Sequence, residues 1–380
     1  MKNVVIAGYA RSPFTLANKG ELIKVRPDEM TAQVVRGLIE KAGVNIEDIE
    51  DVIIGSAFPE AEQGLNVARI ISFLAGIPKS AAATTVNRFC GSSMQAIHMA
   101  AGAIQMGAGD VFICGGIESM SRVPMGGFNP APHPRLYKEY PEAYVSMGIT
   151  AENLAKQYNI SRQEQEEMAV ESHARAAAAR TAGKFTDEII PIVDGNIRVD
   201  QDGCIRPETS LEKLAGLNPA FDASGSVTAA TSSPLTDGAS ATLICSEEYA
   251  DANGLTKMAR IKSIAVAGCA PEVMGIGPVP ATRKVLARAG LTIEQMDVIE
   301  LNEAFAAQGL ASLRELGVAD DAPHVNPNGG AIALGHPLGM SGARMALTAA
   351  YQLRRTGGRY ALCTMCVGVG QGAALTLARV

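Results

Sequence analysis

The feature of this chain that most limits its possible folds is an internal repeat. Residues 42–58 begin Ala-Gly-Val-Asn-Ile-Glu-Asp-Ile and end Ala-Phe, and they align without a gap with residues 289–305, which begin Ala-Gly-Leu-Thr-Ile-Glu-Gln-Met and end Ala-Phe. Each copy follows a predicted helix, and Gly43 or Gly290 is placed to end that helix. Each copy then enters a short apolar strand. The repeat predicts a chain built from two related halves.

The predicted elements that follow the repeat also come in the same order in both halves. In each half a turn or glycine-rich loop leads to a helix of small residues and then to another apolar strand. The predicted strands lie at 51–54, 111–114, 298–301 and 360–363, and the helices at 92–106 and from about 341. Strands that alternate with helices predict the α/β class, with parallel sheets covered by helices on their faces.

A region of different character, residues 119–231, separates the two halves. It opens with a loop rich in Pro, Gly and Met at 124–134. A helix is predicted from Ser161, where Ser-Arg-Gln-Glu forms a capping box, and it continues through the alanine-rich run 174–182. We expect an inserted loop domain that carries substrate specificity. The expected units are an N-terminal half (1–118 plus 232–250), the loop domain (119–231) and a C-terminal half (251–380).

Composition excludes several classes of protein. Of 380 residues, 47% are hydrophobic, which is enough for a large core, and the net charge of -6 without a basic run argues against nucleic-acid or membrane-surface binding. No apolar run reaches about 18 residues, so no membrane span is expected. The start of the chain does not predict a signal peptide. Seven cysteines, an odd number, do not suggest a secreted disulfide framework, and we expect a cytoplasmic protein.

Cys90 is the first candidate for chemistry. It lies in Asn-Arg-Phe-Cys-Gly-Ser-Ser, at a turn just before the helix that is predicted from Ser92. A helix N-terminus favours negative charge and would stabilise a thiolate, which makes Cys90 a candidate nucleophile. A buried core cysteine is the alternative interpretation.

His336 is the second candidate. It follows the loop Asn-Pro-Asn-Gly-Gly that begins at Asn326, and Gly335, Pro337 and Gly339 surround it. A general base for a cysteine would need such a rigid support and a pKa near neutrality. A structural loop histidine is the alternative.

Cys366 is the third candidate, and two other interpretations of its surroundings fail. Cys363-x-x-Cys366 has no second pair and no nearby histidine, and residues three apart in a strand point to opposite faces, so neither a zinc site nor a dithiol is expected. Gly368-x-Gly-x-Gly lacks the spacing and the following elements of a dinucleotide fingerprint. We expect these glycines to allow close backbone approach and to offer N–H donors.

The fourth candidate is Asn302-Glu303, which follows the strand of the second repeat copy. The first copy has Gly55-Ser56 at the same place. Because ligands of α/β folds gather at the carboxyl ends of strands, polar residues at one strand end indicate a possible functional site.

Together, these four motifs resemble the thiolase family over essentially the whole chain. The resemblance implies two duplicated α/β halves that form a layered αβαβα core with an inserted loop domain. It implies that Cys90 takes an acyl group as a thioester, that His336 activates Cys90, and that Cys366 moves a proton to or from the α-carbon of acetyl-CoA. Asn302 would hold a water that forms, with His336, an oxyanion hole for the enolate. The backbone N–H groups of Cys90 and Gly368 would form the second hole.

The resemblance also implies ligands and partners. Arg206 and Ser233 would contact coenzyme A, and Met147 and Phe221 would pack on its pantetheine or on the acyl chain. Coenzyme A is a co-substrate, and neither a tightly bound cofactor nor a metal is expected. Family members are dimers or tetramers, so we expect a homodimer or homotetramer. A complex with a hydratase/dehydrogenase subunit is a further hypothesis.

Two positions bear on the substrate. The segment 228–238 resembles the Thr-Ser-Ser form of degradative thiolases, and Ser146 replaces the histidine of the biosynthetic branch. This favours cleavage of 3-oxoacyl-CoA by coenzyme A in fatty-acid β-oxidation. The alternative is an acetoacetyl-CoA thiolase running toward condensation. A ketoacyl synthase would use Cys-His-His or Cys-His-Asn, where this chain has Cys366, and a catalytically dead acyl-CoA-binding protein would not need all four motifs.

Overall fold

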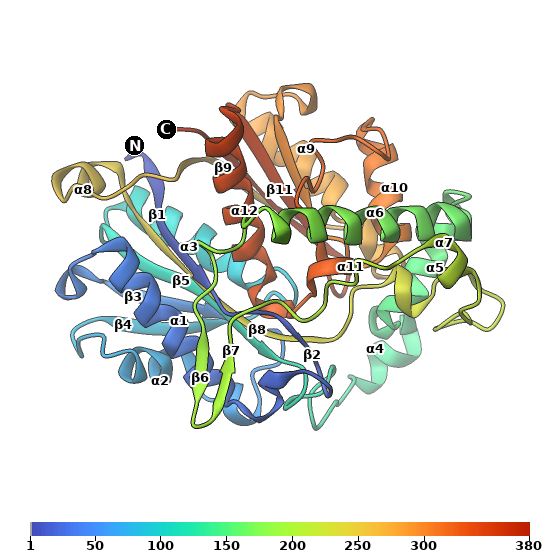
Figure 1. Cartoon of the computed structure of the whole chain (residues 1–380), viewed down its shortest axis with the longest axis horizontal. Helices are drawn as coiled ribbons and strands as arrows, with labels where there is room; N and C mark the ends of the chain where they lie inside the picture. The colour runs from blue at the N-terminus through green and yellow to red at the C-terminus, as the bar shows by residue number, and fades with distance from the viewer. Residues whose placement is uncertain (1) are drawn as a thin grey trace.

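The computed structural model describes residues 2–380, and its frame is a ten-stranded mixed sheet in which the two halves of the chain join (Figure 1). The strands run in the order β10-β11-β12-β9-β1-β8-β5-β3-β4, and β2 pairs with β8 beside this path. Their bounds are β1 (Val4–Arg11), β2 (Thr15–Leu16), β3 (Asp51–Gly55), β4 (Ala82–Val86), β5 (Val111–Ser119), β8 (Thr236–Ser246), β9 (Ala259–Gly268), β10 (Val298–Leu301), β11 (Tyr360–Val367) and β12 (Gln371–Ala378). The halves meet where β1 pairs antiparallel with β9.

Strand directions repeat between the halves, and they correct the prediction of parallel sheets. In the first half β4, β3 and β5 are parallel, whereas β8 runs antiparallel to β5 and β1. In the second half β10 and β11 are parallel, whereas β12 runs antiparallel to β11 and β9. The physical reason is clearest at β12, which follows β11 after a turn too short for a crossover, so that only an antiparallel pair can form.

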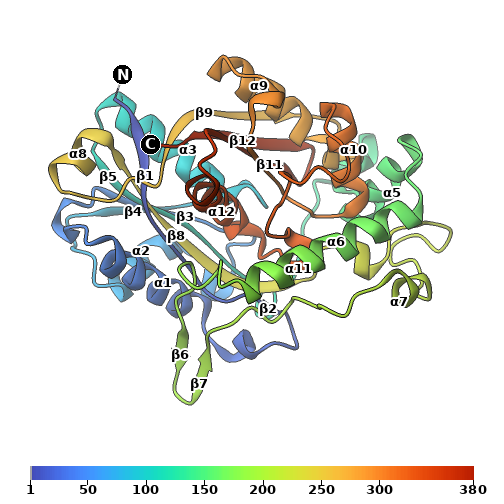
Figure 2. The same cartoon turned by 45° about the horizontal axis from the view of Figure 1, so that its top comes forward.

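Three layers of helices alternate with the two halves of this sheet, as the predicted αβαβα core requires (Figure 2). The middle layer consists of α3 (Ser92–Met106) and α12 (Ser341–Thr356), whose apolar residues share one core with strands of both halves. The outer layers are α1 (Pro27–Ala42) with α2 (Val67–Leu74), and α9 (Pro278–Ala289) with α10 (Ala306–Leu316). The layered fold follows from the distribution of apolar residues. The helices of the outer layers are apolar on one face, whereas the helices of the middle layer are apolar on most of their surface.

Several predicted boundaries are confirmed. Helices α1 and α9 end at Gly43 and Gly290, which adopt the left-handed conformation with φ of 66° and 65°.

Both β5 and β11 extend beyond their predicted ends, to Ser119 and Val367. In β5 the extension includes Gly115, where a Cβ atom would lie 2.1 Å from a backbone oxygen of β8. A glycine that seems to interrupt a strand is thus required by close packing.

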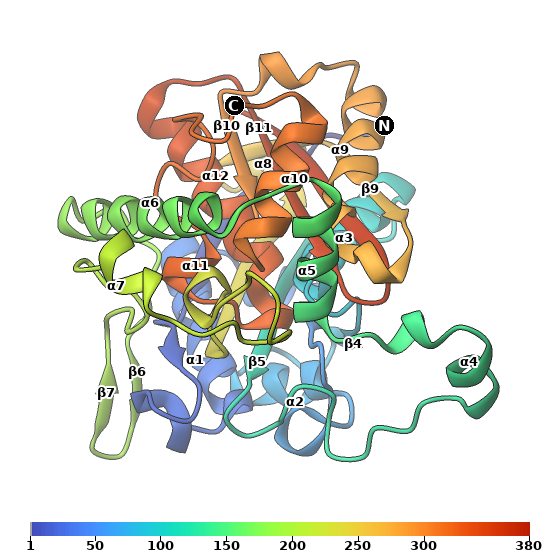
Figure 3. The same ribbon diagram turned by 90° about the vertical axis from the view of Figure 1, so that its right-hand side faces the viewer.

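The segment between the halves packs mainly beside the second half (Figure 3). It contains α4 (Pro134–Glu139), α5 (Met147–Gln157), α6 (Arg162–Thr181), the hairpin of β6 (Ile192–Asp194) and β7 (Ile197–Val199), and α7 (Leu211–Ala215). The predicted capping box at Ser161 is present, and the alanine-rich run belongs to α6. Helix α6 packs on α11 (Ala331–Leu334), just before His336. In residues 2–380, no helix is both long and apolar enough for a membrane span.

Candidate active site

Cys90 lies at the corner between β4 and α3, and the backbone around it is held in an unusual conformation. The preceding residue, Phe89, has a φ of +43°. Asn87 Oδ1 accepts a hydrogen bond from the Phe89 N–H at 2.8 Å, and Ser92 Oγ donates to the Phe89 carbonyl at 2.6 Å. Local side chains therefore fix the corner and leave the thiol of Cys90 half-buried at the start of α3.

The end of β11 brings the second cysteine and the glycine loop to Cys90. The backbone N–H of Gly368 is directed at the Cys90 thiol and opposes part of the rise that burial causes in its pKa. Cys366 lies close enough that an ionised Cys90 would add to the rise that burial causes in the pKa of Cys366. Cys363 points the other way, toward α12, where its Sγ donates to the Met345 carbonyl at 3.5 Å. The two cysteines of the Cys-x-x-Cys sequence thus face opposite sides of the sheet, as predicted.

His336 is buried and its tautomer follows from its neighbours. Ser341 Oγ donates to the Pro337 carbonyl at 3.0 Å, and it lies 2.7 Å from His336 Nδ1. Because that hydroxyl proton is already used, Nδ1 carries the proton and donates to Ser341. Nε2 is therefore the unprotonated nitrogen, 3.3 Å from Asn302 Nδ2. Nε2 accepts from the Asn302 amide in this arrangement, and an unprotonated ring nitrogen is what a general base requires.

Asn302 lies directly after β10, where its N–H donates to the Thr364 carbonyl at 3.1 Å. Its side-chain Nδ2 faces His336, whereas its Oδ1 is buried without a hydrogen-bond partner among the described residues. A buried acceptor of this kind is normally paired with a donor, often a water molecule. Asn302 Oδ1 is thus available to a water, and the expected role of Asn302 in holding one stays a prediction.

Glu303, the residue after Asn302, has a structural role that the sequence does not predict. Its Oε1 accepts from Asn326 Nδ2 at 2.8 Å, and its Oε2 accepts from Ser172 Oγ at 2.6 Å and from the Ile332 N–H at 3.2 Å. This buried carboxylate joins β10, α6 and the loop that leads to His336. The only sequence signal was its place beside Asn302, because its partners are remote in the chain.

The electrostatics differ from two expectations. Burial, followed by the charge of Glu118, raises the pKa of Cys90 to about 12, whereas a helix N-terminus was expected to lower it. Burial, followed by the charge of Arg344, lowers the pKa of His336 to about 3, below the expected neutrality. The cost of removing a charge from water exceeds the contribution of one helix terminus here. Thiol and imidazole are thus both neutral at rest.

The raised pKa of the Cys90 thiol predicts how its reactivity depends on pH. Below a pKa of about 12 the thiolate fraction rises tenfold per pH unit. We therefore expect the rate of Cys90 alkylation by iodoacetamide, followed by mass spectrometry of the Cys90 peptide, to rise throughout pH 6–9. A plateau reached by pH 7 would contradict this and would indicate a preformed thiolate–imidazolium pair.

Three of the four predicted coenzyme A contacts lie around the site. The N–H and Oγ of Ser233 both donate to the Ala304 carbonyl, at 3.0 and 3.1 Å, two residues after Asn302. Met147 Sδ lies 3.8 Å from where a Cβ would stand on Gly368.

The third contact, Phe221, packs edge-on against Phe305 with ring centroids 5.8 Å apart. Arg206 is exposed and lies beside α6, where its N–H donates to His173 Nδ1 at 3.1 Å. In the described residues, no hydrogen bond or ring contact joins the Arg206 side chain to the other three.

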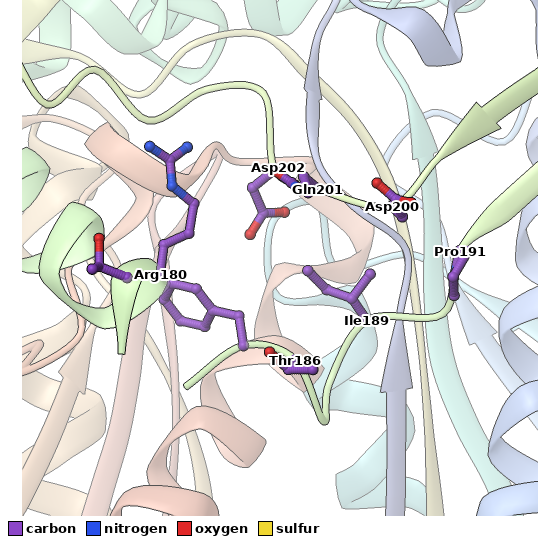
Figure 4. Close-up of a pocket in the computed structure, with 9 residues that line it drawn as sticks. Arg180, Thr186, Ile189, Pro191, Asp200, Gln201 and Asp202 are labelled. Atoms are coloured by element: carbon purple, nitrogen blue, oxygen red, sulfur yellow. The ribbon is translucent and has the colours of Figure 1, made fainter. Parts of the chain in front are cut away.

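A separate cavity of about 520 Å³ lies beside α6, and none of these residues lines it (Figure 4). Arg180, Phe185 and Asp202 are among the side chains that line it. The Asp202 carboxylate is already paired with the buried Arg11 through two contacts of 2.8 Å. Because no predicted site residue lines this cavity, we assign it no part in the chemistry. Within residues 2–380, no group of three or more His, Cys, Asp or Glu side chains could hold a metal ion.

Comparison with known proteins identifies the family of this chain. Residues 4–248 match the family model for the thiolase N-terminal domain, and residues 255–379 match that for the thiolase C-terminal domain. The chain is 50% identical, over 404 aligned residues and the full length of both, to the 3-oxoadipyl-CoA/3-oxo-5,6-dehydrosuberyl-CoA thiolase of Escherichia coli strain K12. It is 50% identical over 386 residues to the 3-ketoacyl-CoA thiolase of Psychrobacter arcticus, covering 100% of this chain and 98% of that protein.

Solved structures give the same result for the fold. Human mitochondrial 3-ketoacyl-CoA thiolase superposes with a TM-score of 0.92 at 37% identity, over 100% of this chain and 99% of the human one. The same human enzyme in complex with CoA superposes with a TM-score of 0.91 at 37% identity, over 100% and 98% of the two chains. The chain belongs to the thiolase family.

Proposed function

We propose that this enzyme is an acyltransferase that uses coenzyme A to cleave 3-oxoacyl-CoA into acetyl-CoA and an acyl-CoA two carbons shorter. The observation that carries the proposal is that elements of the second half pack on Cys90: Gly368 and Cys366 lie beside its thiol, and Leu338, two residues after His336, shares an apolar cluster with it. Cys90 comes from the first half, whereas His336, with an unprotonated Nε2, and Cys366 come from the second. Relatives that are 50% identical and named 3-ketoacyl-CoA thiolase support it.

In the first half-reaction, the sulfur of Cys90 attacks the C3 carbonyl carbon while its proton passes to His336 Nε2. Because both groups are neutral at rest, proton transfer accompanies the attack. The N–H groups of Cys90 and Gly368 hold the oxygen of the tetrahedral intermediate. Its collapse breaks the C2–C3 bond and leaves an acyl thioester on Cys90 and the enolate of acetyl-CoA.

The enolate is then protonated at its α-carbon by the Cys366 thiol. During this step the enolate oxygen is held by the protonated Nε2 of His336 and by a water bound to Asn302. The incoming coenzyme A thiol gives its proton to the Cys366 thiolate and attacks the acyl thioester. Cys90 leaves and takes back the proton from His336. Two thiols are needed because one carries the acyl group while the other moves protons.

The chain-length range decides between the two forms of this proposal. We expect thiolysis of 3-oxoacyl-CoA substrates longer than acetoacetyl-CoA, as a degradative enzyme of fatty-acid β-oxidation would show. Rates of acetyl-CoA release would be measured with acetoacetyl-CoA, medium- and long-chain 3-oxoacyl-CoA and 3-oxoadipyl-CoA, the last because of the Escherichia coli relative. Activity confined to acetoacetyl-CoA would favour the acetoacetyl-CoA thiolase running toward condensation instead.

A homodimer in the cytoplasm is the proposed working form. The edge strand β4 pairs with β3 and with no other strand of residues 2–380, and Ile70, Phe73 and Leu74 are exposed on the neighbouring α2. An edge strand and an apolar patch can pair with their own copy across a twofold axis. Light scattering would show twice 39.6 kDa for the dimer.

Co-purification with a hydratase/dehydrogenase subunit would test the proposed complex, and a lone homo-oligomer would count against it.

A further inference from the structure

A buried carboxylate stands between the two loops that carry the proposed nucleophile and base. Glu118 lies near the end of β5 and is 1% exposed. Its Oε2 accepts from the backbone N–H of Ala57 at 2.8 Å and from that of Gly339 at 2.9 Å. Ala57 belongs to the first half of the chain and Gly339 to the second. A single oxygen atom thus binds both halves at their junction.

From Ala57, hydrogen bonds lead to Cys90. The Ala57 carbonyl accepts from Asn87 Nδ2 at 3.0 Å, and Asn87 Oδ1 accepts from the Phe89 N–H at 2.8 Å. Phe89, with its positive φ, immediately precedes Cys90. A residue in this sparsely populated conformation stays there only when its surroundings hold it. The position of the Cys90 sulfur therefore depends on this chain of contacts.

From Gly339, a short turn leads back to His336. Gly339 lies in the 3-10 turn Leu338–Met340, just before Ser341, whose hydroxyl holds Nδ1 of His336. A Cβ on Gly339 would lie 2.8 Å from Glu118 Oε2, so this turn is pressed against the carboxylate. The turn that follows the proposed base is thus attached to the same oxygen atom.

The partners of this side chain require a carboxylate. Glu118 Oε1 accepts from Gln63 Nε2 at 2.8 Å, and Gln63 Oε1 in turn accepts from the Ser119 N–H. Every hydrogen-bond partner of Glu118 is therefore an N–H donor, and an amide in its place would point its own N–H₂ at a donor. Its charge also raises the pKa of the Cys90 thiol, which opposes thiolate formation. The benefit of the carboxylate must then be geometric.

We infer that Glu118 is a positioning residue, which sets the distance between Cys90 and His336 by holding their two loops on one carboxylate. This inference rests on the roles proposed above for Cys90 and His336. In residues 2–380, Glu118 forms a hydrogen bond with neither the Cys90 sulfur nor the His336 imidazole, so its effect on the reaction passes through the backbone of the two loops.

The inference predicts a loss in kcat without a matching loss in binding. In a Glu118→Gln variant, kcat for thiolysis is expected to fall about 100-fold, the effect of misplacing reacting groups by about 1 Å. KM for coenzyme A is expected to stay within about threefold, because no predicted coenzyme A contact touches Glu118. A purely structural role would lower the melting temperature and leave kcat per folded enzyme unchanged.

An exchange of carboxylate and amide gives a rescue test. In the double variant Glu118→Gln/Gln63→Glu, the amide at position 118 accepts from Ala57 and Gly339 and donates to the carboxylate at position 63, which also accepts from the Ser119 N–H. The Phe58 carbonyl loses its 2.9 Å donor, Gln63 Nε2, so recovery is partial. We expect kcat at least about tenfold above that of Glu118→Gln. A double variant no better than the single one would overturn the inference.

Glu152→Gln is the matched control. Glu152 is also 1% exposed and accepts from the Val227 and Ser226 N–H groups at 2.8 and 3.0 Å, entirely inside the inserted segment. It should lose a similar amount of thermal stability but keep kcat within about threefold. An equal loss of kcat in both variants, or none in Glu118→Gln, would overturn the inference. If Cys90→Ala stays active, the proposed site itself is wrong and the inference falls with it.

Discussion

A Cys90→Ala variant is expected to lose at least about 10⁴-fold in thiolysis rate while it keeps its fold, because no other group can carry the acyl intermediate. Cys90 sits at the corner before α3, with its backbone held from Asn87 and Ser92 rather than through its sulfur. Removing the sulfur should therefore leave the corner and the melting temperature nearly unchanged. The rate of acetyl-CoA release from a 3-oxoacyl-CoA measures the loss.

The control for this prediction is Cys245→Ala, which removes a fully buried thiol from the far end of β8. It should reduce stability slightly and leave the rate unchanged. Trapping the intermediate adds an independent measurement: wild type mixed with a 3-oxoacyl-CoA and quenched in acid should carry the shortened acyl group on the Cys90 peptide. An acyl group found on another cysteine, or a Cys90→Ala variant with near-normal rate, would show that the nucleophile is misassigned.

The internal repeat is the reason that the two-unit architecture of the fold could be predicted. Two copies of one pattern must form two similar units, and glycines that end helices are local signals, so α1 and α9 end as expected at Gly43 and Gly290. Strand direction was not predictable in the same way. Whether β8 and β12 run parallel or antiparallel to their neighbours depends on how the chain returns to the sheet, which apolar patterning does not record.

In the site, too, features set by neighbouring residues could be predicted, and features set by residues remote in the chain could not. Motif residues lie on local turns that the sequence makes recognisable. The structure places Gly368 and Cys366 beside Cys90, and Asn302 beside His336. The carboxylates that hold those turns were missed or given no role, because their partners are remote. Glu118 and Gly339 lie 221 positions apart. The pKa shifts were also misjudged, since burial by the whole fold outweighs the local helix terminus.

Replacing Cys366 with alanine is the second change with a large expected effect, and it should separate the two kinds of chemistry at the site. Burial raises the pKa of the Cys366 thiol well above its ordinary value, so it stays protonated and can act as an acid. Without it, the enolate lacks its proton donor, and thiolysis should fall about 10²- to 10⁴-fold. Acetylation of Cys90 by acetyl-CoA involves no α-carbon proton, and the departing coenzyme A thiolate can take its proton from water instead of Cys366, so this rate should fall less than the rate of thiolysis.

Deuterium exchange tests the assigned step directly. In D₂O the wild-type enzyme should exchange the methyl protons of acetyl-CoA, and the Cys366→Ala variant should not, as read by mass spectrometry of the recovered thioester. Cys363→Ala is the matched control, because Cys363 is equally buried on the same strand but faces α12. Exchange that persists in Cys366→Ala, or is lost equally in Cys363→Ala, would mean that another group moves the α-proton. Exchange lost only with Cys366, while Cys90 is still acetylated, would assign one thiol to each of the two steps.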